Sequence, residues 1–290
     1  MPATGNKETK TNMMTQDANG TPRLARGTES ETHRMTIRVA KSSLSFAIVD
    51  RHSGKQLAFE PYIAKSGVSI AANLREAFKT SPLLQRQTTR ARVLVDSPTL
   101  VVPIEEYKEE DREALYMHSF PDTEGSIVVS NVMAGLNCAA LFALNRDLKL
   151  VVEDHYQDVH YTCLMRPVWD YLHRRSFIGN RRKLYAYFHD GALELFSYER
   201  NRFVFCNRYD TRHTKDAVYF ILFVWKQLAL DQMRDELFIV GDIPDKENLL
   251  ATLRKYVSVV IVVNPSANFN RAPLTQIDGI TFDLITTFLG

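Results

Sequence analysis

The stretch LYAYFHDGALELFSY, residues 184–198, decides the fold. Two apolar runs flank His189-Asp190-Gly191, and an Asp-Gly pair between such runs is a strong β-hairpin signal. The pattern downstream predicts a strand, a helix, a strand, a helix and a strand, at residues 202–209, 214–231, 236–240, 245–256 and 257–263. Thr214 is the expected N-cap of the first helix. Residues 257–263 are almost entirely Val and Ile, which favours a central strand that is buried on both faces.

The same order of elements occurs 147 positions earlier. Strands are predicted at 37–40, 44–50, 56–64 and 90–95, and Ser69 is the expected N-cap of a helix that ends before Pro82. A constant shift aligns Ile37 with Leu184, Tyr62 with Tyr209, Leu74 with Ile221, Phe78 with Trp225, Lys79 with Lys226, and Val93 with Val240. The alternative to a real repeat is that any two units with this order of elements can be superposed by sliding one along the other. Because about 60 positions align without a gap, we favour a real repeat of the architecture.

The chain divides into four parts on this pattern. Residues 1–34 contain no aromatic residue and few apolar ones, so we expect a disordered tail. The first unit is predicted at 35–178, with an insertion that carries a solvated helix at 105–119, strands at 126–132 and 138–144, a helix capped by Asn145, a strand at 159–164 and a helix at 166–175. The second unit is predicted at 183–264, and 265–290 form a C-terminal extension.

Composition excludes several classes of protein. The chain has 290 residues, 36 Lys+Arg against 34 Asp+Glu, and 45% hydrophobic residues, which are ordinary values for a globular protein. A net charge of +2 argues against a dedicated nucleic-acid binder. The longest apolar run, 217–225, is too short to span a bilayer, and the N-terminus has no secretory h-region, so we expect a cytoplasmic location. The three cysteines contain no CxxC pair and favour buried thiols over a zinc site or disulfides.

Three antiparallel strands, a helix, a strand, a helix and a strand form a ribonuclease-H-like unit. The predicted fold class is therefore α/β, with two such units in tandem, mixed sheets and helices on both faces. This arrangement resembles the superfamily of actin, sugar kinases and heat-shock chaperone ATPases. The segments MTIRV (35–39), LSFAI (44–48), DAVYFILFVWKQL (216–228) and FIVGDI (238–243) also resemble an uncharacterised bacterial family, domain of unknown function 3822, found mostly in Bacteroidota. None of these segments carries catalytic residues.

The resemblance implies an ATP site in the cleft between the units, formed by two Asp-x-Gly hairpin turns and a glycine-rich adenosine loop. The first turn here, Ala40-Lys41-Ser42-Ser43, has neither Asp nor Gly. The second has Asp190-Gly191 with altered spacing, and the adenosine loop keeps only Gly241. Turn formation alone accounts for these residues. If the cleft is retained, the candidate cofactor-binding residues are Lys41, Ser42, Ser43, Asp190, Gly191 and Gly241.

Other constellations give weaker signals. Residues 153–160 hold two histidines and three carboxylates, but His155 and His160 are five apart and do not share a helix face. Cys163 with His160 or His173 matches no nucleophile motif, and no P-loop or GxGxxG occurs. Arginines follow aromatics around 174–175, 181–183, 200–202, 208 and 212. They suit single-stranded RNA only if they converge on one face, and a half-buried sheet accounts for the same alternation.

We therefore expect a non-catalytic, actin-like fold that acts as a binding or scaffold module for an unidentified protein partner. We expect no catalytic residues, no metal, no cofactor, no membrane span and no nucleic-acid partner. The alternative is a divergent nucleotide-binding protein that uses ATP and Mg²⁺, with Lys41, Ser43 and Asp190 facing one another across a groove.

Overall fold

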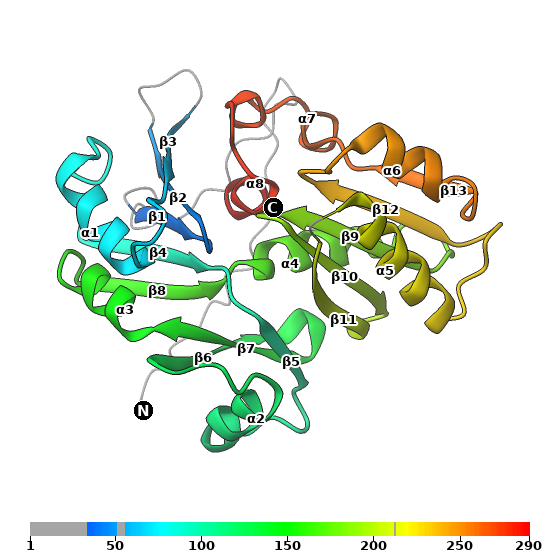
Figure 1. The fold of residues 1–290 in the computed structure, drawn as a ribbon, viewed down its shortest axis with the longest axis horizontal. Helices are drawn as coiled ribbons and strands as arrows, with labels where there is room; N and C mark the ends of the chain where they lie inside the picture. Colours follow the sequence, from blue (N-terminus) through cyan, green and yellow to red (C-terminus); the bar gives the residue numbers. More distant parts are fainter. Residues whose placement is uncertain (1–33, 51–55, 212) are drawn as a thin grey trace, which may run out of the picture.

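The computed structural model describes residues 34–50, 56–211 and 213–290. The predicted tail, the turn at His52-Ser53-Gly54 and Arg212 lie wholly or largely outside these ranges. Only Arg34 of the expected tail is described, and it begins the first strand. Two five-stranded sheets lie side by side, and a smaller three-stranded sheet extends from the first (Figure 1).

The two large sheets have the same topology. The first has the spatial order β3 (Leu57–Ile63), β2 (Ser43–Val49), β1 (Arg34–Val39), β4 (Arg90–Val95) and β8 (Asp158–Cys163). The second has the order β11 (Arg202–Asp210), β10 (Ala192–Glu199), β9 (Lys183–His189), β12 (Glu236–Gly241) and β13 (Val259–Val262). In each sheet the first three strands of the unit are antiparallel and the last two add in parallel. The predicted α/β fold with two mixed sheets is confirmed.

Helices cover the outer faces of the two five-stranded sheets and also lie between their inner faces. The alternate residues Met35, Ile37 and Val39 of β1 share a core with α1 (Ile70–Thr80) and α3 (Arg146–Glu153). In the second sheet, α5 (Thr214–Gln227) and α6 (Lys246–Leu253) pack on one face. The helices α4 (Met165–Ser176) and α8 (Phe282–Leu289) contact each other and lie between the two sheets (Figure 1).

One continuous hydrophobic cluster joins the two halves. It contains Met35 and Ile37 of β1, Tyr171 of α4, Phe282 of α8 and Tyr187 of β9. An interface of this kind does not favour free motion of one half relative to the other. The opposite face of β1 carries Arg38, which points toward α8.

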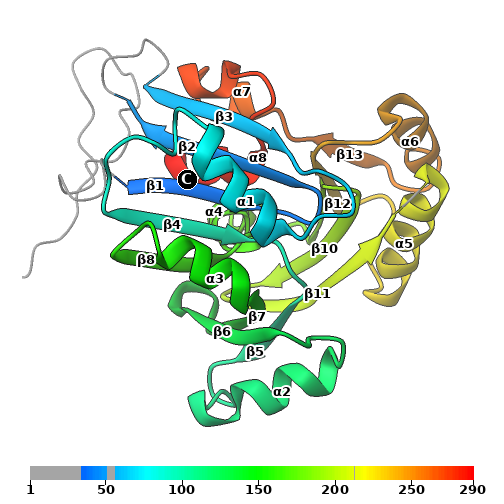
Figure 2. The ribbon, with the colours of Figure 1, turned by 60° about the vertical axis from the view of Figure 1, so that its left-hand side comes forward.

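The insertion forms a small sheet of its own. Its strands are β5 (Thr99–Pro103), β7 (Cys138–Asn145) and β6 (Ser126–Met133), and α2 (Arg112–Ser119) covers one face with the buried Tyr116 (Figure 2). The prediction of a helix over 105–119 was wrong in its first part. A short 3-10 turn, Glu109–Asp111, precedes α2, and β5 was not predicted.

Most helix caps follow the sequence signals. Ser69 and Asn145 accept hydrogen bonds from the backbone of Ala72 and Leu148, as predicted. Thr214 is not the N-cap of α5. That position belongs to His213, which forms a capping box with Asp216.

One expectation about burial was wrong. The Val-rich strand β13 is an edge strand and is half-buried, not central. On α5, which contains the longest apolar run of the sequence, Tyr219 is 62% exposed and Phe223 is 51% exposed. Within the part of the chain that the structure describes, none of the helices is long and apolar enough to cross a membrane.

Candidate functional site

The two hairpin turns that the sequence singled out meet between the halves. Asp190 and Gly191 both have positive φ, 47° and 75°, as the two-residue turn between β9 and β10 requires. The turn between β1 and β2 is closed by a hydrogen bond from the Ala40 N–H to the Ser43 carbonyl. Ser43 Oγ donates a hydrogen bond to Asp190 Oδ1 over 2.9 Å. The turns therefore face each other and touch.

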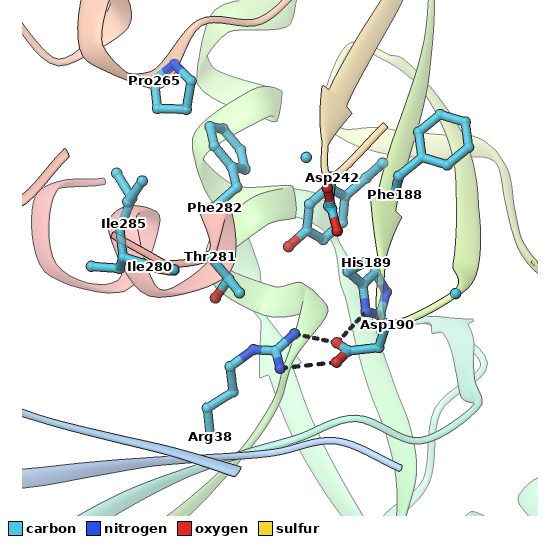
Figure 3. A pocket seen from close by; sticks show the side chains of 14 residues that line it. Arg38, Phe188, His189, Asp190, Asp242, Pro265, Ile280, Thr281, Phe282 and Ile285 are labelled. Carbon is cyan, nitrogen blue, oxygen red and sulfur yellow. Dashed lines mark hydrogen bonds and ion pairs between the residues drawn. The ribbon is translucent and has the colours of Figure 1, made fainter. Parts of the chain in front are cut away.

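A buried arginine fills the space beside this contact. Arg38 projects from β1 and donates from Nε to Asp283 Oδ1 over 2.9 Å, and its other nitrogens pair with Asp190 (Figure 3). Asp283 also accepts from the hydroxyls of Tyr187, over 2.8 Å, and Thr281, over 2.6 Å. Burial alone would lower the pKa of Arg38, but the two carboxylates outweigh it and hold the pKa above its ordinary value. Arg38 therefore stays charged and links both halves to α8.

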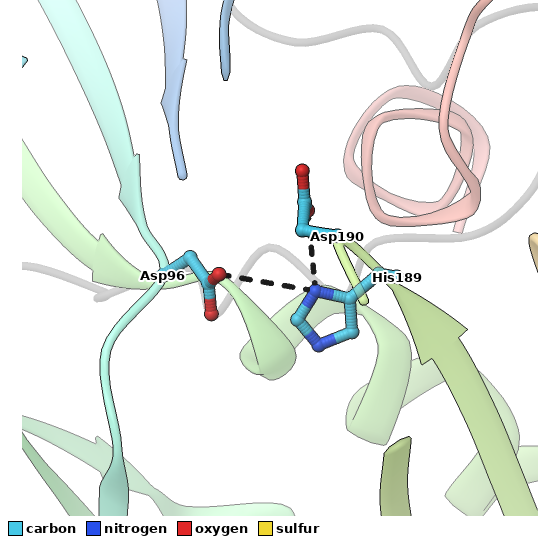
Figure 4. Close-up of side chains that lie close together, drawn as sticks. All are labelled: Asp96, His189 and Asp190. Carbon is cyan, nitrogen blue, oxygen red and sulfur yellow. Dashed lines mark hydrogen bonds and ion pairs between the residues drawn. The ribbon is translucent and has the colours of Figure 1, made fainter. Parts of the chain in front are cut away.

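A histidine lies on the other side of Asp190. His189 Nδ1 is 3.3 Å from Asp190 and 4.0 Å from Asp96, which follows β4 (Figure 4). Its Nε2 lies 3.7 Å from Glu194, and Arg208 pairs with both Asp96 and Glu194. Burial would lower the pKa of His189, but its hydrogen bond to Asp190 and the nearby carboxylates of Glu194 and Asp96 raise it from 6.5 to about 9. The imidazole is therefore an imidazolium at neutral pH.

Asp190 lies between these two cations. Burial would raise the pKa of Asp190, but His189 and Arg38 lower it well below its usual range. Its carboxylate is ionised and is already bonded to Arg38, His189 and Ser43.

The residues around His189 do not fit a metal ion. Ligand atoms of Asp96, His189 and Asp190 lie within 4.8 Å of one another. Arg38 and Arg208, however, already pair with Asp190 and Asp96 and so neutralise the two carboxylates. The described cluster is better satisfied by its own ion pairs than by a cation.

A cavity of about 490 Å³ opens above Arg38, between the second sheet and the C-terminal segment (Figure 3). Three of the predicted site residues line it, Asp190, Gly191 and Gly241. The others do not. Lys41 and Ser42 are exposed, and Ser43 reaches the site only through its bond to Asp190. The rest of the lining is Arg38, Tyr187, Phe188, His189, Asp242, Pro265, Gly279, Ile280, Thr281, Phe282 and Ile285.

Gly241 has a packing role at this cavity. Its φ is 88°, and a Cβ atom there would lie 2.1 Å from the Phe188 carbonyl oxygen. The next residue, Asp242, donates its backbone N–H to the same carbonyl. Only glycine allows β12 to end this close to β9.

Sequence reasoning missed Arg38, Asp96 and Asp283. The signal for Arg38 was present, because Arg34, Thr36 and Arg38 alternate with apolar residues along β1 and must share the opposite face. Nothing in the sequence pairs Arg38 with Asp283, which is 245 residues away.

Several side chains of the predicted basic clusters are held by contacts within the fold. Lys183 is buried and donates to three backbone carbonyls of the α4–β9 connection. Arg182 bonds to Asp235 and to the end of α5, and Arg202 bonds to Glu105. Arg208 is committed to Asp96. These four side chains are engaged within the fold and do not contribute to a basic surface for RNA.

The comparisons with known proteins agree with this architecture. A family model described as "Protein of unknown function (DUF3822)" matches residues 26–260. The chain belongs to this family. A crystal structure of a Bacteroides thetaiotaomicron protein with an actin-like ATPase fold and unknown function is 26% identical, with a TM-score of 0.75 over 87% of this chain and 98% of that one. The resemblance to DUF3822 and to the actin-like fold is confirmed.

A second solved structure has a fold similar to that of this DUF3822 chain. The PilM–PilN type IV pilus biogenesis complex matches with a TM-score of 0.51 and 10% identity, over 89% of this chain and 98% of that one. This likeness concerns the fold alone. No curated protein matches the chain.

Proposed function

We propose that this DUF3822 chain is a non-catalytic binding protein, which keeps the actin-like architecture but acts by contact with another macromolecule. The observation that carries the proposal is the ion pair between Arg38 and Asp190. This ion pair places the guanidinium of Arg38 against the carboxylate of Asp190, which is the one carboxylate in the two facing turns. Further support comes from the hydrophobic cluster that joins the halves, which favours a rigid body over an opening and closing cleft.

The residues present do not fit Mg-ATP. Binding of a hydrated magnesium ion would need a free carboxylate, and Asp190 is bonded to Arg38, His189 and Ser43. The first turn has no glycine to bring backbone N–H groups toward a phosphate, and its Lys41 does not line the cavity.

A binding role is compatible with the solved structure of similar fold that comes from the PilM–PilN type IV pilus biogenesis complex. That complex is a property of the pilus proteins. For this chain it supports only the idea that an actin-like body can serve as a docking unit.

The test is a calorimetric titration with Mg-ATP. We expect no heat beyond dilution at micromolar nucleotide. Micromolar binding by the wild type that disappears in Asp190→Ala would overturn the proposal. Affinity purification from native cells then tests the positive half, and a partner that rebinds in purified form without nucleotide is the expected result. A partner that rebinds only when ATP is present would count against it.

A metal-independent nucleotide site is the second candidate, because the turns face each other and a cavity of about 490 Å³ lies beside them. It would use Asp190, Gly191 and Gly241 and would leave Lys41 and Ser42 outside. ATP binding that survives EDTA and is lost in Asp190→Ala supports this candidate. If no such binding is measured, the candidate is excluded.

A further inference from the structure

The α4–β9 turn, residues 177–182, holds two large apolar side chains in solvent. Phe177 is 56% exposed and Ile178 is 64% exposed. The two residues follow each other in the chain, after α4 has ended and before β9 begins. Apolar residues that are exposed singly are common on protein surfaces and need no explanation. An adjoining pair of this size forms an apolar contact surface.

The backbone of the α4–β9 turn is tied to one buried ammonium group. Lys183 is 5% exposed, and its Nζ donates to the carbonyl oxygens of Ser176, Ile178 and Arg181 over 3.0, 2.8 and 3.3 Å. An ammonium group has three donors, so all of them are satisfied within the fold. Because its burial would be costly without these acceptors, the turn is held in one shape. Phe177 and Ile178 are therefore displayed by a fixed backbone.

Arginines from two segments border the apolar pair. Arg174 and Arg175 are exposed in the last turn of α4, directly before the pair. Arg200 is exposed in the β10–β11 turn, and His173 Nε2 of α4 donates to its carbonyl oxygen over 2.9 Å. The His173 ring also packs edge-on against the Phe177 ring, with centroids 4.9 Å apart. The end of α4 and the β10–β11 turn thus place three arginines beside the apolar pair.

These three arginines are available to a partner. The other charged side chains near the turn form pairs, which are Arg181 with Glu236, Arg182 with Asp235, and Arg166 with Asp170. Arg174, Arg175 and Arg200 form no ion pair among the described residues. Arg175 lies over the Tyr171 ring, 5.7 Å from its centroid. The exposed Glu199 beside Arg200 offsets one of the three charges, so the surface is positive in balance.

We propose that the α4–β9 turn binds the surface of an anionic lipid bilayer, with Phe177 and Ile178 inserted among the headgroups and the three arginines on the lipid phosphates. A bilayer presents an apolar interior beneath a layer of negative charge, which matches an apolar pair bordered by cations. Arginine stems are long and apolar, so their guanidinium groups can stay at the phosphates while the pair lies deeper. Such a contact is peripheral and needs no membrane-spanning helix.

The bilayer contact does not depend on the proposed function. The cavity beside Asp190 shares none of the residues that form the apolar pair or its arginines. A failure of either proposal therefore leaves the other standing, because the Mg-ATP titration reports on the cavity and vesicle binding reports on the turn.

The experiment is co-sedimentation of the full chain with vesicles, either of phosphatidylcholine alone or of phosphatidylcholine and phosphatidylglycerol in equal amounts. We expect binding to the anionic vesicles that weakens as salt is raised, because arginines respond to the surface potential. Phe177→Ser/Ile178→Ser should lower the partition coefficient by about tenfold or more, since the inserted apolar area is lost. Tyr219→Ser/Phe223→Ser is the matched control, because that exposed aromatic pair lies on α5, and it should bind like the wild type.

A second measurement uses a tryptophan as a reporter in the turn. The native Trp169 and Trp225 are both buried, so Phe177→Trp adds an exposed fluorophore. Its emission should move to shorter wavelength when anionic vesicles are added and should stay unchanged with neutral ones.

Four results would overturn the proposal. They are no binding to anionic vesicles, equal binding to neutral and anionic vesicles, unchanged binding by Phe177→Ser/Ile178→Ser, and a Phe177→Trp emission that does not move. A turn that instead serves an acidic protein partner would give the first of these results. The reporter variant keeps the test decisive if the double serine variant does not fold.

Discussion

Ser43 and Asp190 are 147 residues apart, the same interval that aligns the two halves of the sequence, and their side chains share a hydrogen bond of 2.9 Å. The two turns that would hold a ligand between them in an active cleft are therefore in contact. Arg38 and His189 bond to the same Asp190 carboxylate from two other directions. The site is a buried charge network that joins two halves of a protein, and its first consequence is for stability.

Removal of Arg38 should strongly destabilise the chain. Asp190 and Asp283 would be left without their shared cation in a buried position, so Arg38→Met should lower the free energy of unfolding by about 3–5 kcal/mol. Urea unfolding measures the change. Arg202→Met is the control, because Arg202 pairs with Glu105 at the surface and such pairs contribute about 1 kcal/mol or less. Equal effects of the two variants would contradict the buried network.

Stability should depend on pH through His189. Its pKa is about 9 in the folded chain and ordinarily 6.5, so the folded state binds the proton more tightly. The stabilisation is therefore fully present below pH 6.5 and is lost as pH rises toward 9, with an upper size of about 3 kcal/mol. Unfolding free energies measured between about pH 6 and about pH 9.5 test this.

His189→Gln should flatten that profile. His118→Gln is the matched control, since His118 is exposed on α2 and no ion pair is formed by it among the described residues. A wild-type profile that is already flat between neutral pH and about pH 9 would show that His189 is not charged in the folded chain. Asp190 should make stability depend on pH in the opposite direction at the acid end. Because the pKa of Asp190 is lowered in the folded chain, its stabilising contribution is lost as pH falls below the usual range of an Asp.

Gly241 should tolerate no side chain. Gly241→Ala would place a Cβ atom 2.1 Å from the Phe188 carbonyl oxygen at a φ of 88°, so β12 would have to move away from β9. We expect a loss of more than about 2 kcal/mol, from the combined steric and backbone costs. Gly179→Ala is the control, because its φ is 79° but no atom lies within 4 Å of the new Cβ. Thermal melts of both variants separate the clash from the backbone strain that they share.

The sequence predicted the architecture because the architecture is local and repeated. The Asp190-Gly191 pair fixes a hairpin by its backbone conformation alone, and the spacing of Leu74 and Phe78 fixes the buried face of α1. The identical strand order of the two sheets then follows from two copies of one local pattern.

The site could not be predicted in the same way, because its members are brought together by the packing of the two halves. Asp283 reaches Arg38 only when α8 lies between the sheets, and no local pattern encodes that placement. The prediction that β13 is buried on both faces was wrong for a related reason. Its Val and Ile residues gave the expected strand, but whether a strand lies at an edge depends on what packs beside it.

The helix α5 offers the sharpest test of the second core. Trp225 is 4% exposed and packs with Leu237, Leu249 and Ile221 in the cluster beneath α5 and α6. Trp225→Ala should lower the free energy of unfolding by about 3–5 kcal/mol, because a large buried side chain leaves a cavity that the surroundings cannot fill. Phe223→Ala, two residues earlier and 51% exposed, should cost less than about 1 kcal/mol. Urea unfolding of the pair measures both, and a change under about 1 kcal/mol for Trp225→Ala would mean that α5 does not bury this face against the second sheet.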